Sequence, residues 1–138
     1  MKFNLVDKVI EQTGDRIVTI KAVTLAEEYL ADHFPTYPVL PGVLMIEALV
    51  QAARQMLTPV SGDPRLVLGE VKALRYGSFV RPGEALRVEV TLVGSEEGRY
   101  HCKGIGHVLR PGVAAPAGEP PTAVSGRFIM RPVRRPAA

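Results

Sequence analysis

Two residues of this sequence have side chains suited to proton transfer near neutral pH, and they stand close together in the chain: His33 and Glu47. An imidazole gains and loses its proton close to neutrality, so His33 could act as a general base. Glu47 is the only carboxylate in the largely apolar segment 43–57. Burial raises the pKa of a carboxyl group, and a protonated carboxyl can act as a general acid.

Both residues also have purely structural interpretations. His33 could be a loop histidine whose nitrogens are satisfied locally, and Glu47 could form an ion pair with Arg54, two turns along the same helix. Gln51 follows Glu47 by one turn. Its amide could orient the Glu47 carboxylate through a hydrogen bond, or could simply satisfy a buried polar position.

The segment 33–42, HFPTYPVLPG, begins at His33 and contains three prolines, at positions 35, 38 and 41. Each proline fixes its own φ and favours an extended conformation for the residue before it. The segment is therefore predicted to be a stiff loop, which would hold His33 in place at low entropic cost.

The segment 43–57 is predicted to be the one long helix, and its apolar residues surround most of its circumference, which is typical of a buried helix. No Ser, Thr, Asp or Asn caps it; Pro41 is placed to open it, and Gly42 has no side chain to block a ligand. The first N–H groups of a helix lack internal partners and carry partial positive charge. They could bind water, or a thioester carbonyl that gains negative charge during a reaction.

The remaining segments predict short strands around this helix. Strands are expected at 3–11, 16–23, 65–80 (bent or broken near Gly77), 85–93, 99–109 and 122–131, with turns at 13–15 and at the GSEEG sequence. The sum is an α+β fold, in which a long central helix is wrapped by a mostly antiparallel sheet.

Three further segments complete the predicted single domain, which spans residues 1–131. Thr24 and Glu27 form a possible capping box that predicts a short helix at 25–31. The segment 110–121 is rich in Pro, Gly and Ala and predicts an exposed, mobile loop, and the tail 132–138 is expected to be frayed.

Composition excludes several classes of function. The net charge of +3 comes from scattered residues and gives no reason to expect nucleic-acid binding. No apolar run approaches the ~20 residues of a membrane helix, and the start of the chain does not resemble a signal peptide. His101 and His107 have no acid or cysteine at ligand spacing, so no metal site is expected. The single cysteine, Cys102, fits a reducing cytoplasm.

The residues around the two candidate groups resemble a family motif. Residues 33–51, HFPTYPVLPGVLMIEALVQ, are similar to the signature HFPxxPVxPGVLxxEAxAQ of the β-hydroxyacyl-acyl carrier protein dehydratases, in the branch whose catalytic acid is glutamate. Residues 79–90, FVRPGEALRVEV, give a second, weaker match. Asp32 and Thr36 stand where the family commonly has glycine, and Glu84 where it has aspartate; none of these changes removes a catalytic group.

The resemblance implies a hot-dog fold and a homodimer with active sites at the subunit interface, in a branch where higher oligomers are common. His33 of one subunit would remove the α-proton of a 3-hydroxyacyl thioester, and Glu47 of the other would protonate the departing hydroxyl. Gly42 and Val43 would bind the thioester carbonyl, with Gln51 beside them. The substrate carrier would be acyl carrier protein or coenzyme A, no cofactor would be needed, and the pathway would be fatty-acid biosynthesis or a related lipid or polyketide route.

Two other functions fit the same fold. A hot-dog thioesterase needs a water activated beside the carbonyl and often uses one carboxylate without the histidine. A non-catalytic acyl-binding protein would keep the fold alone, because a fold does not fix a function. His33 separates these hypotheses, since only the dehydratase uses it together with Glu47.

Overall fold

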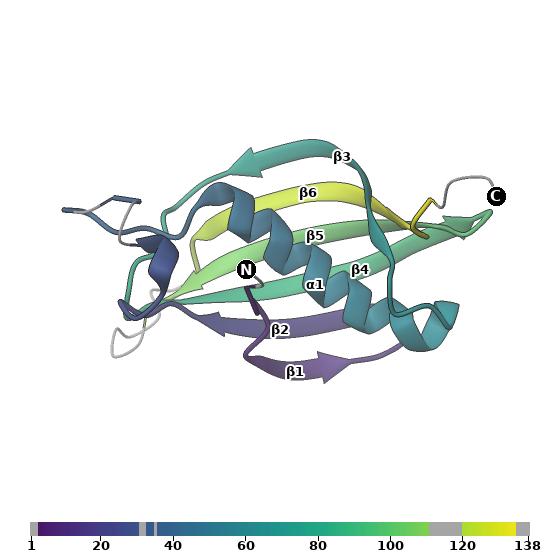
Figure 1. Cartoon of the computed structure of the whole chain (residues 1–138), viewed down its shortest axis with the longest axis horizontal. Helices are drawn as coiled ribbons and strands as arrows, with labels where there is room; N and C mark the ends of the chain where they lie inside the picture. Colours follow the sequence, from purple (N-terminus) through teal and green to yellow (C-terminus); the bar gives the residue numbers. More distant parts are fainter. Residues whose placement is uncertain (1–2, 31–32, 35, 111–119, 135–138) are drawn as a thin grey trace.

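The computed structural model describes residues 3–30, 33–34, 36–110 and 120–134. Figure 1 shows one long helix lying across one face of a sheet. The elements, in chain order, are β1 (Lys8–Gln12), β2 (Arg16–Ala22), the 3₁₀ turn η1 (Glu28–Leu30), α1 (Gly42–Ser61), β3 (Val67–Tyr76), β4 (Ala85–Glu96), β5 (Arg99–Leu109) and β6 (Thr122–Arg131).

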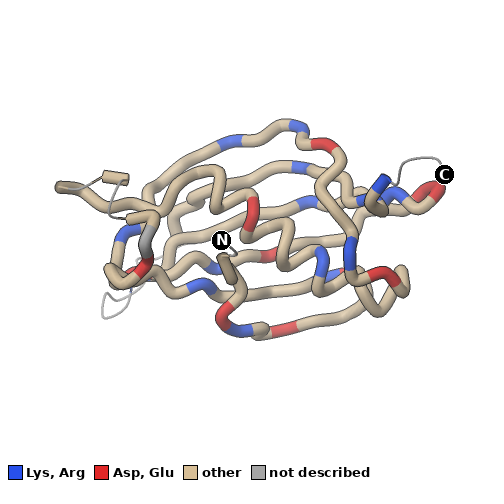
Figure 2. The backbone as a smooth tube through the Cα atoms, in the orientation of Figure 1, with Lys and Arg blue, Asp and Glu red and all other residues tan. Residues whose placement is uncertain are grey.

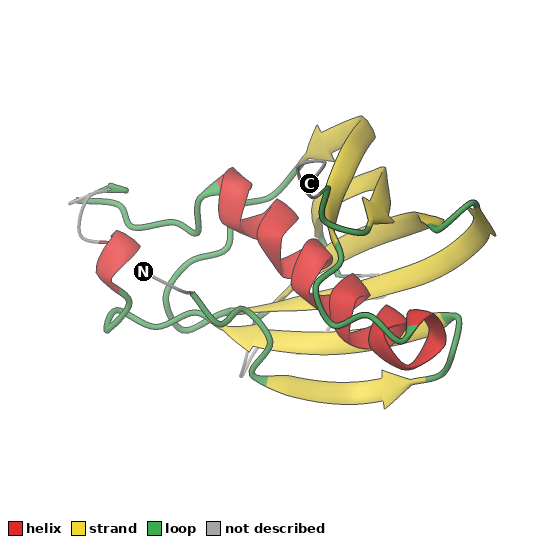
Figure 3. Cartoon of the chain, turned by 45° about the vertical axis from the view of Figure 1, so that its right-hand side comes forward, coloured by secondary structure: helices red, strands yellow, loops and turns green. Residues whose placement is uncertain are grey.

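The strands form one antiparallel sheet with the order β1-β2-β4-β5-β6-β3. The two edge strands are therefore β1 and β3, and β3 reaches its place beside β6 only after the chain has passed through α1. Figure 3 shows the sheet curving around one side of the helix. The opposite side of the helix is not covered by the sheet. This confirms the predicted α+β arrangement of a central helix against an antiparallel sheet.

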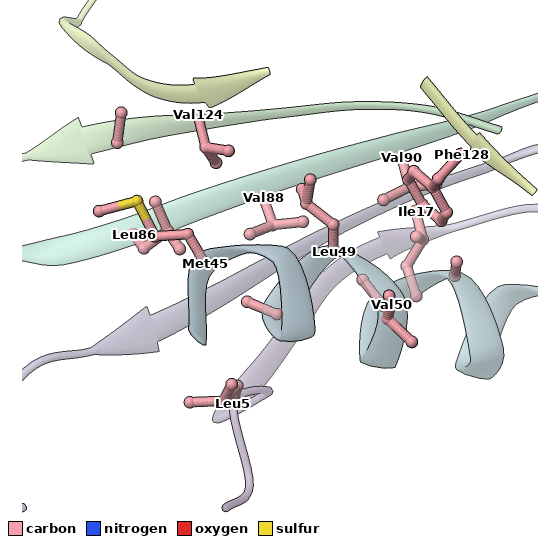
Figure 4. Close-up of a cluster of buried hydrophobic side chains, with 14 of the residues drawn as sticks. Leu5, Ile17, Met45, Leu49, Val50, Leu86, Val88, Val90, Val124 and Phe128 are labelled. Carbon is pink, nitrogen blue, oxygen red and sulfur yellow. The ribbon is translucent and has the colours of Figure 1, made fainter. Parts of the chain in front are cut away.

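The core lies between α1 and the concave face of the sheet (Figure 4). The alternation of β4 puts Leu86, Val88 and Val90 at 0% exposure, as the sequence predicts for one face of a strand. Leu49 of α1 packs above Gly104 of β5, where an added Cβ would stand 3.1 Å from the leucine methyl group. The missing side chain thus lets the helix approach the middle of the sheet.

The helix is longer and less completely buried than predicted. It runs to Ser61 instead of ending at residue 57, and Gly62 ends it in the left-handed conformation with φ 72°. Pro59 lies inside the last turns and has no N–H to give to the carbonyl of Gln55. Instead, the Nε2 of Gln12 in β1 donates a hydrogen bond to that carbonyl oxygen at 3.2 Å.

The helix is less buried than its apolar residues predict, because the sheet covers only one side of it. Val43 is 70% exposed, and several apolar neighbours on its side of α1 are only partly buried. In the single chain the helix therefore has one buried face and one face open to solvent.

The predicted first strand begins too early. Residues 3–5 do not pair with β2; the Gln51 side chain of α1 donates to the oxygen of Phe3 at 2.7 Å and accepts from the N–H of Leu5 at 2.8 Å. A polar side chain of the helix satisfies this backbone, so the strand starts only at Lys8.

The predicted short helix at 25–31 is also wrong. The structure has only the 3₁₀ turn Glu28–Leu30 in this region. The Glu27 carboxylate does not complete a capping box; it lies 2.6 Å from the Nζ of Lys21, which is itself nearly buried. Leaving the buried ammonium group of Lys21 without a partner would cost more free energy than leaving the turn uncapped.

Several turns agree with the sequence. Thr13 donates its N–H to the oxygen of Arg16 at 2.8 Å, which closes the first turn. The GSEEG hairpin turns at Glu97 and Gly98, which both have positive φ, 51° and 75°. Most of the predicted 110–121 loop and of the 132–138 tail lies outside the described residues. None of the described helices is long and apolar enough to cross a membrane.

Candidate active site

His33 is held by the loop that it begins. Val39 donates its backbone N–H to the oxygen of His33 at 3.0 Å, and the Nδ1 of His33 lies 3.1 Å from the oxygen of Val39. A carbonyl oxygen only accepts, so Nδ1 carries the proton in this bond. In the neutral ring, Nε2 then has the free lone pair, which is the state that a general base requires.

The same loop is anchored to the rest of the fold. Leu40 donates its N–H to the oxygen of Val80 at 2.8 Å, and both residues are buried. The ring of Phe34 stacks on the imidazole of His33 with 4.4 Å between centroids. The imidazole therefore has one backbone partner and one aromatic neighbour, and the stiffness predicted for the loop stays a prediction.

The start of α1 has no side-chain cap. Pro41 stands at the cap position with φ −59° and ψ 141°, and no side-chain hydrogen bond caps the helix. The first turn contains no acidic residue, so nothing within it neutralises the partial positive charge of the N–H groups. The N–H groups of Gly42 and Val43 therefore stand at a helix start without a side-chain cap, and the binding role predicted for them stays a prediction.

Tyr76, at the end of β3, covers Gly42. A Cβ on Gly42 would lie 2.8 Å from two ring carbons of Tyr76 and 3.1 Å from its hydroxyl oxygen. Burial raises the pKa of the Tyr76 hydroxyl. Sequence reasoning missed this residue because β3 and the helix start are brought together only by the crossover of the chain.

Glu47 lies on the open side of α1 and is partly buried. The Nε2 of Gln51 donates to its Oε1 at 3.2 Å, so the hydrogen bond predicted between these two side chains is present. The alternative ion pair with Arg54 is wrong, because the Nε of Arg54 donates to the oxygen of Leu66 at 2.8 Å and the described residues show no salt bridge between Arg54 and Glu47. Glu47 is thus left with an amide partner and access to solvent.

A groove of about 1010 Å³ runs along this side of the helix. Its walls are one face of α1 and the N-terminal segment: Phe3, Asn4, Val6, Gln12, Glu47, Gln51, Arg54, Gln55, Thr58, Pro59 and Pro64. His33 does not line it. Within one chain, therefore, the structure brings Glu47 and Gln51 together and Gly42 next to Val43, but it does not place His33 in the groove of Glu47.

Throughout the described ranges, no three His, Cys, Asp or Glu residues lie close enough together to hold an ion. Burial raises the pKa of the Cys102 thiol to about 12, so this cysteine is a poor nucleophile near neutral pH.

Comparison with known proteins shows the family of this chain. The FabA-like domain family has a model that matches residues 1–112 of the chain. The chain belongs to the FabA-like family. The matched residues include the His33 loop, the start of α1 and the strand β4 that packs beneath it.

Two curated relatives of this FabA-like chain carry the name of the same enzyme. The 3-hydroxyacyl-[acyl-carrier-protein] dehydratase FabZ of Thermotoga petrophila is 41% identical over 107 residues, which cover 77% of each chain. The enzyme of the same name from Bacillus cereus is 46% identical over 93 residues, or 65% of each chain.

Solved structures show that the FabA-like chain has the expected hot-dog fold. The dehydratase heterocomplex ApeI:P from Xenorhabdus doucetiae has a TM-score of 0.66 at 15% identity, with 95% of this chain and 99% of that one covered. An acyl-CoA hydrolase from Bacillus cereus has a TM-score of 0.67 at 13% identity, with 88% and 68% covered. Because the fold serves both reactions, the structural likeness by itself does not choose between them.

Proposed function

We propose that this protein is a 3-hydroxyacyl-[acyl-carrier-protein] dehydratase of fatty-acid biosynthesis, which converts a 3-hydroxyacyl thioester into a trans-2-enoyl thioester and water. The observation that carries the mechanism is the bond between Nδ1 of His33 and the oxygen of Val39. It leaves Nε2 as the acceptor for a substrate proton, and a thioesterase that relies on one carboxylate has no need of such a histidine.

In the proposed reaction, Nε2 of His33 takes the α-proton, and the electrons of that C–H bond form an enolate. The N–H groups at Gly42 and Val43 stabilise the negative oxygen, helped by the positive end of α1. Glu47 then gives a proton to the 3-hydroxyl group as the C–O bond breaks, so that water leaves and the enoyl double bond forms. The reverse hydration uses the same groups.

Gln51 supports this chemistry indirectly. Both ends of its amide are engaged by the N-terminal segment, and Nε2 also reaches Glu47. We therefore propose that Gln51 belongs to the substrate-binding site and orients the carboxyl group of Glu47.

We propose that the working unit is a homodimer in which His33 of one protomer faces Glu47 of its partner. Two features support this. His33 lies outside the groove of Glu47 within one chain, and α1 keeps an apolar, solvent-exposed side at Val43. The edge strand β3, which has a sheet neighbour only at β6, is the natural place for pairing between the two sheets.

The carrier-linked substrate and the buried single thiol are compatible with a cytoplasmic location.

One assay tests the function. The protein is incubated with a 3-hydroxyacyl or trans-2-enoyl thioester of acyl carrier protein, and the enoyl absorbance and free thiol are followed separately. Interconversion without thiol release is expected. Thiol release would instead identify a thioesterase, and no change over several chain lengths would identify an acyl-binding protein. His33→Ala and Glu47→Gln should each lower the dehydratase rate by ~10²–10⁴-fold.

A further inference from the structure

A transverse row of basic side chains crosses the face of the sheet opposite α1. The strand registers place Lys72 of β3 opposite Arg127 of β6, and Arg127 opposite Lys103 of β5. The next opposed pair, Cys102 and Phe128, is buried in the core, so Lys103 and Arg127 point away from the helix. Figure 2 shows the basic positions of β3, β6 and β5 side by side in the middle of the sheet.

This row is unfavourable in the absence of a ligand. Like charges directly opposite one another on neighbouring strands destabilise a sheet. Lys72 is relieved by Glu70, whose Oε1 lies 3.7 Å from its Nζ. Within the part of the chain that the structure describes, Lys103 and Arg127 have no such ion pair, so their repulsion is left uncompensated.

A hollow of about 770 Å³ lies over this row. Its lining combines cations with hydroxyl donors: Arg75, Lys103, Arg127, Thr91 and Ser125. Its one carboxylate, Glu89, is already bound by Arg16 at 3.0 Å and by Arg87 at 3.6 Å. None of the lining residues belongs to the groove of Glu47.

The backbone of β3 is distorted where it borders the hollow. The pairing with β6 shifts between Lys72 and Arg75, and Ala73 takes a positive φ of 53°, which is rare for a residue with a side chain. An even register would place Leu74 opposite Ser125; the bulge places Arg75 there. The strain at Ala73 therefore adds a guanidinium group to the hollow.

His107 adds an imidazole to the lining of the hollow. It is only 9% exposed. Its Nε2 has no hydrogen-bond partner among the described residues. A buried polar atom without a partner is costly, so the fold carries an unmet hydrogen bond in a residue that borders the hollow.

We propose that this hollow is a second ligand site, which binds a compact, multiply charged phosphate-type anion. Phosphate oxygens match the chemistry present, since guanidinium, ammonium, hydroxyl and imidazole groups all donate to them. The anion lies over the middle of the sheet, cancels the repulsion between Lys103 and Arg127, and receives hydrogen bonds from Arg75 and the adjacent hydroxyl groups.

Pyrophosphate is the probe for the test. It is titrated into the full chain by calorimetry at an ionic strength held constant with KCl, and the imidazole signals are followed by NMR. Saturable binding with a shift of the His107 signals is expected. Lys103→Gln/Arg127→Gln should weaken binding by about tenfold or more, because each cation contributes a charge-assisted bond. Arg65→Gln, an exposed cation outside the hollow, is the matched control and should bind as the wild type does.

The double variant loses a repulsive pair, so without pyrophosphate its Tm should equal or exceed that of the wild type, and pyrophosphate should raise the Tm of the wild type alone. A nucleoside diphosphate that binds no tighter than pyrophosphate would identify the phosphate groups as the whole recognition element. The proposal is overturned if binding is not saturable, or if Arg65→Gln weakens it equally. It is also overturned if the double variant is slower only with carrier-bound substrate, which would make this face a docking surface for an acidic protein.

Discussion

The ring of Tyr76 lies against the Cα of Gly42, so close that a single added methyl group would stand 2.8 Å from it. This contact joins the end of β3 to the first residue of α1. It closes one side of the helix start and leaves the side of Val43 open to a ligand.

The first prediction concerns this contact. Tyr76 is 51% exposed and meets Gly42 with the far end of its ring, so the ring can turn away from an added methyl group. Gly42→Ala should therefore lower the free energy of unfolding by no more than ~1 kcal/mol, the low end of the overpacking cost, and should reduce turnover by displacing the ring at the helix start. Chemical denaturation and kcat measure the two effects. In a Tyr76→Ala background the ring is absent, so adding Gly42→Ala should cause no further loss of stability. Equal losses with and without the tyrosine ring would show that the contact is not the cause.

The second prediction concerns Gln51, which links Glu47 to the N-terminal segment. Gln51→Leu leaves the oxygen of Phe3 and the N–H of Leu5 without their partner, which should cost ~1–3 kcal/mol for each unsatisfied group. It also releases Glu47, so kcat should fall by about tenfold to a hundredfold. Gln55→Leu, one turn further along the same groove, is the control and should retain kcat. A variant that loses stability but keeps its rate would mean that Gln51 does not orient the acid.

The third prediction tests the pairing of His33 and Glu47 across two protomers. His33→Ala and Glu47→Gln are unfolded together, mixed in equal amounts and refolded. Half of the dimers are then mixed, and each mixed dimer contains one intact site, so activity should return to about a quarter of the wild-type value. Each variant refolded alone is the control. Failure of the mixture to recover activity, with dimers present by light scattering, would place both residues in the same chain's site.

The fourth prediction concerns acid stability. The Arg16 guanidinium, helped by Arg87, holds the pKa of Glu89 below its ordinary value of 4.5. A lowered folded pKa contributes stability above the unfolded pKa, and this contribution is lost as pH falls through the folded pKa. Between about pH 5 and pH 3, the free energy of unfolding should therefore fall more steeply in the wild type than in Glu89→Gln. Urea denaturation measures both slopes, with the exposed Glu96→Gln as control; parallel slopes for wild type and Glu89→Gln would contradict the assignment.

The sequence predicts the elements whose patterns are local. The alternation of β4 and the run of β6 at residues 122–131 reflect burial on one face of each strand, which repeats every second residue. The uncapped helix start and the link between Gln51 and Glu47 could also be anticipated, because both depend on positions within one turn of a helix.

What the sequence does not predict depends on distant contacts. The late start of β1 follows from the bonds of Phe3 and Leu5 to Gln51, which lies 46 residues or more away in the chain. The contact between Tyr76 and Gly42 depends on the crossover to β3. The three-residue turn at Glu28–Leu30 replaces the predicted helix, because the carboxylate of Glu27 forms an ion pair with the buried Lys21 instead of capping a helix.

The two edges of the sheet differ in a way that limits growth. β1 has only five residues, is interrupted by a bulge between Val9 and Glu11, and is tied to the end of α1 through Gln12. β3 also has shifts in its pairing with β6, but it is twice as long, with ten residues. In the dimer proposed above, the two sheets pair at β3, so only the short β1 edges remain at the two ends of the joined sheet. Such a protein can form a closed pair while resisting the endless strand addition that builds fibrils.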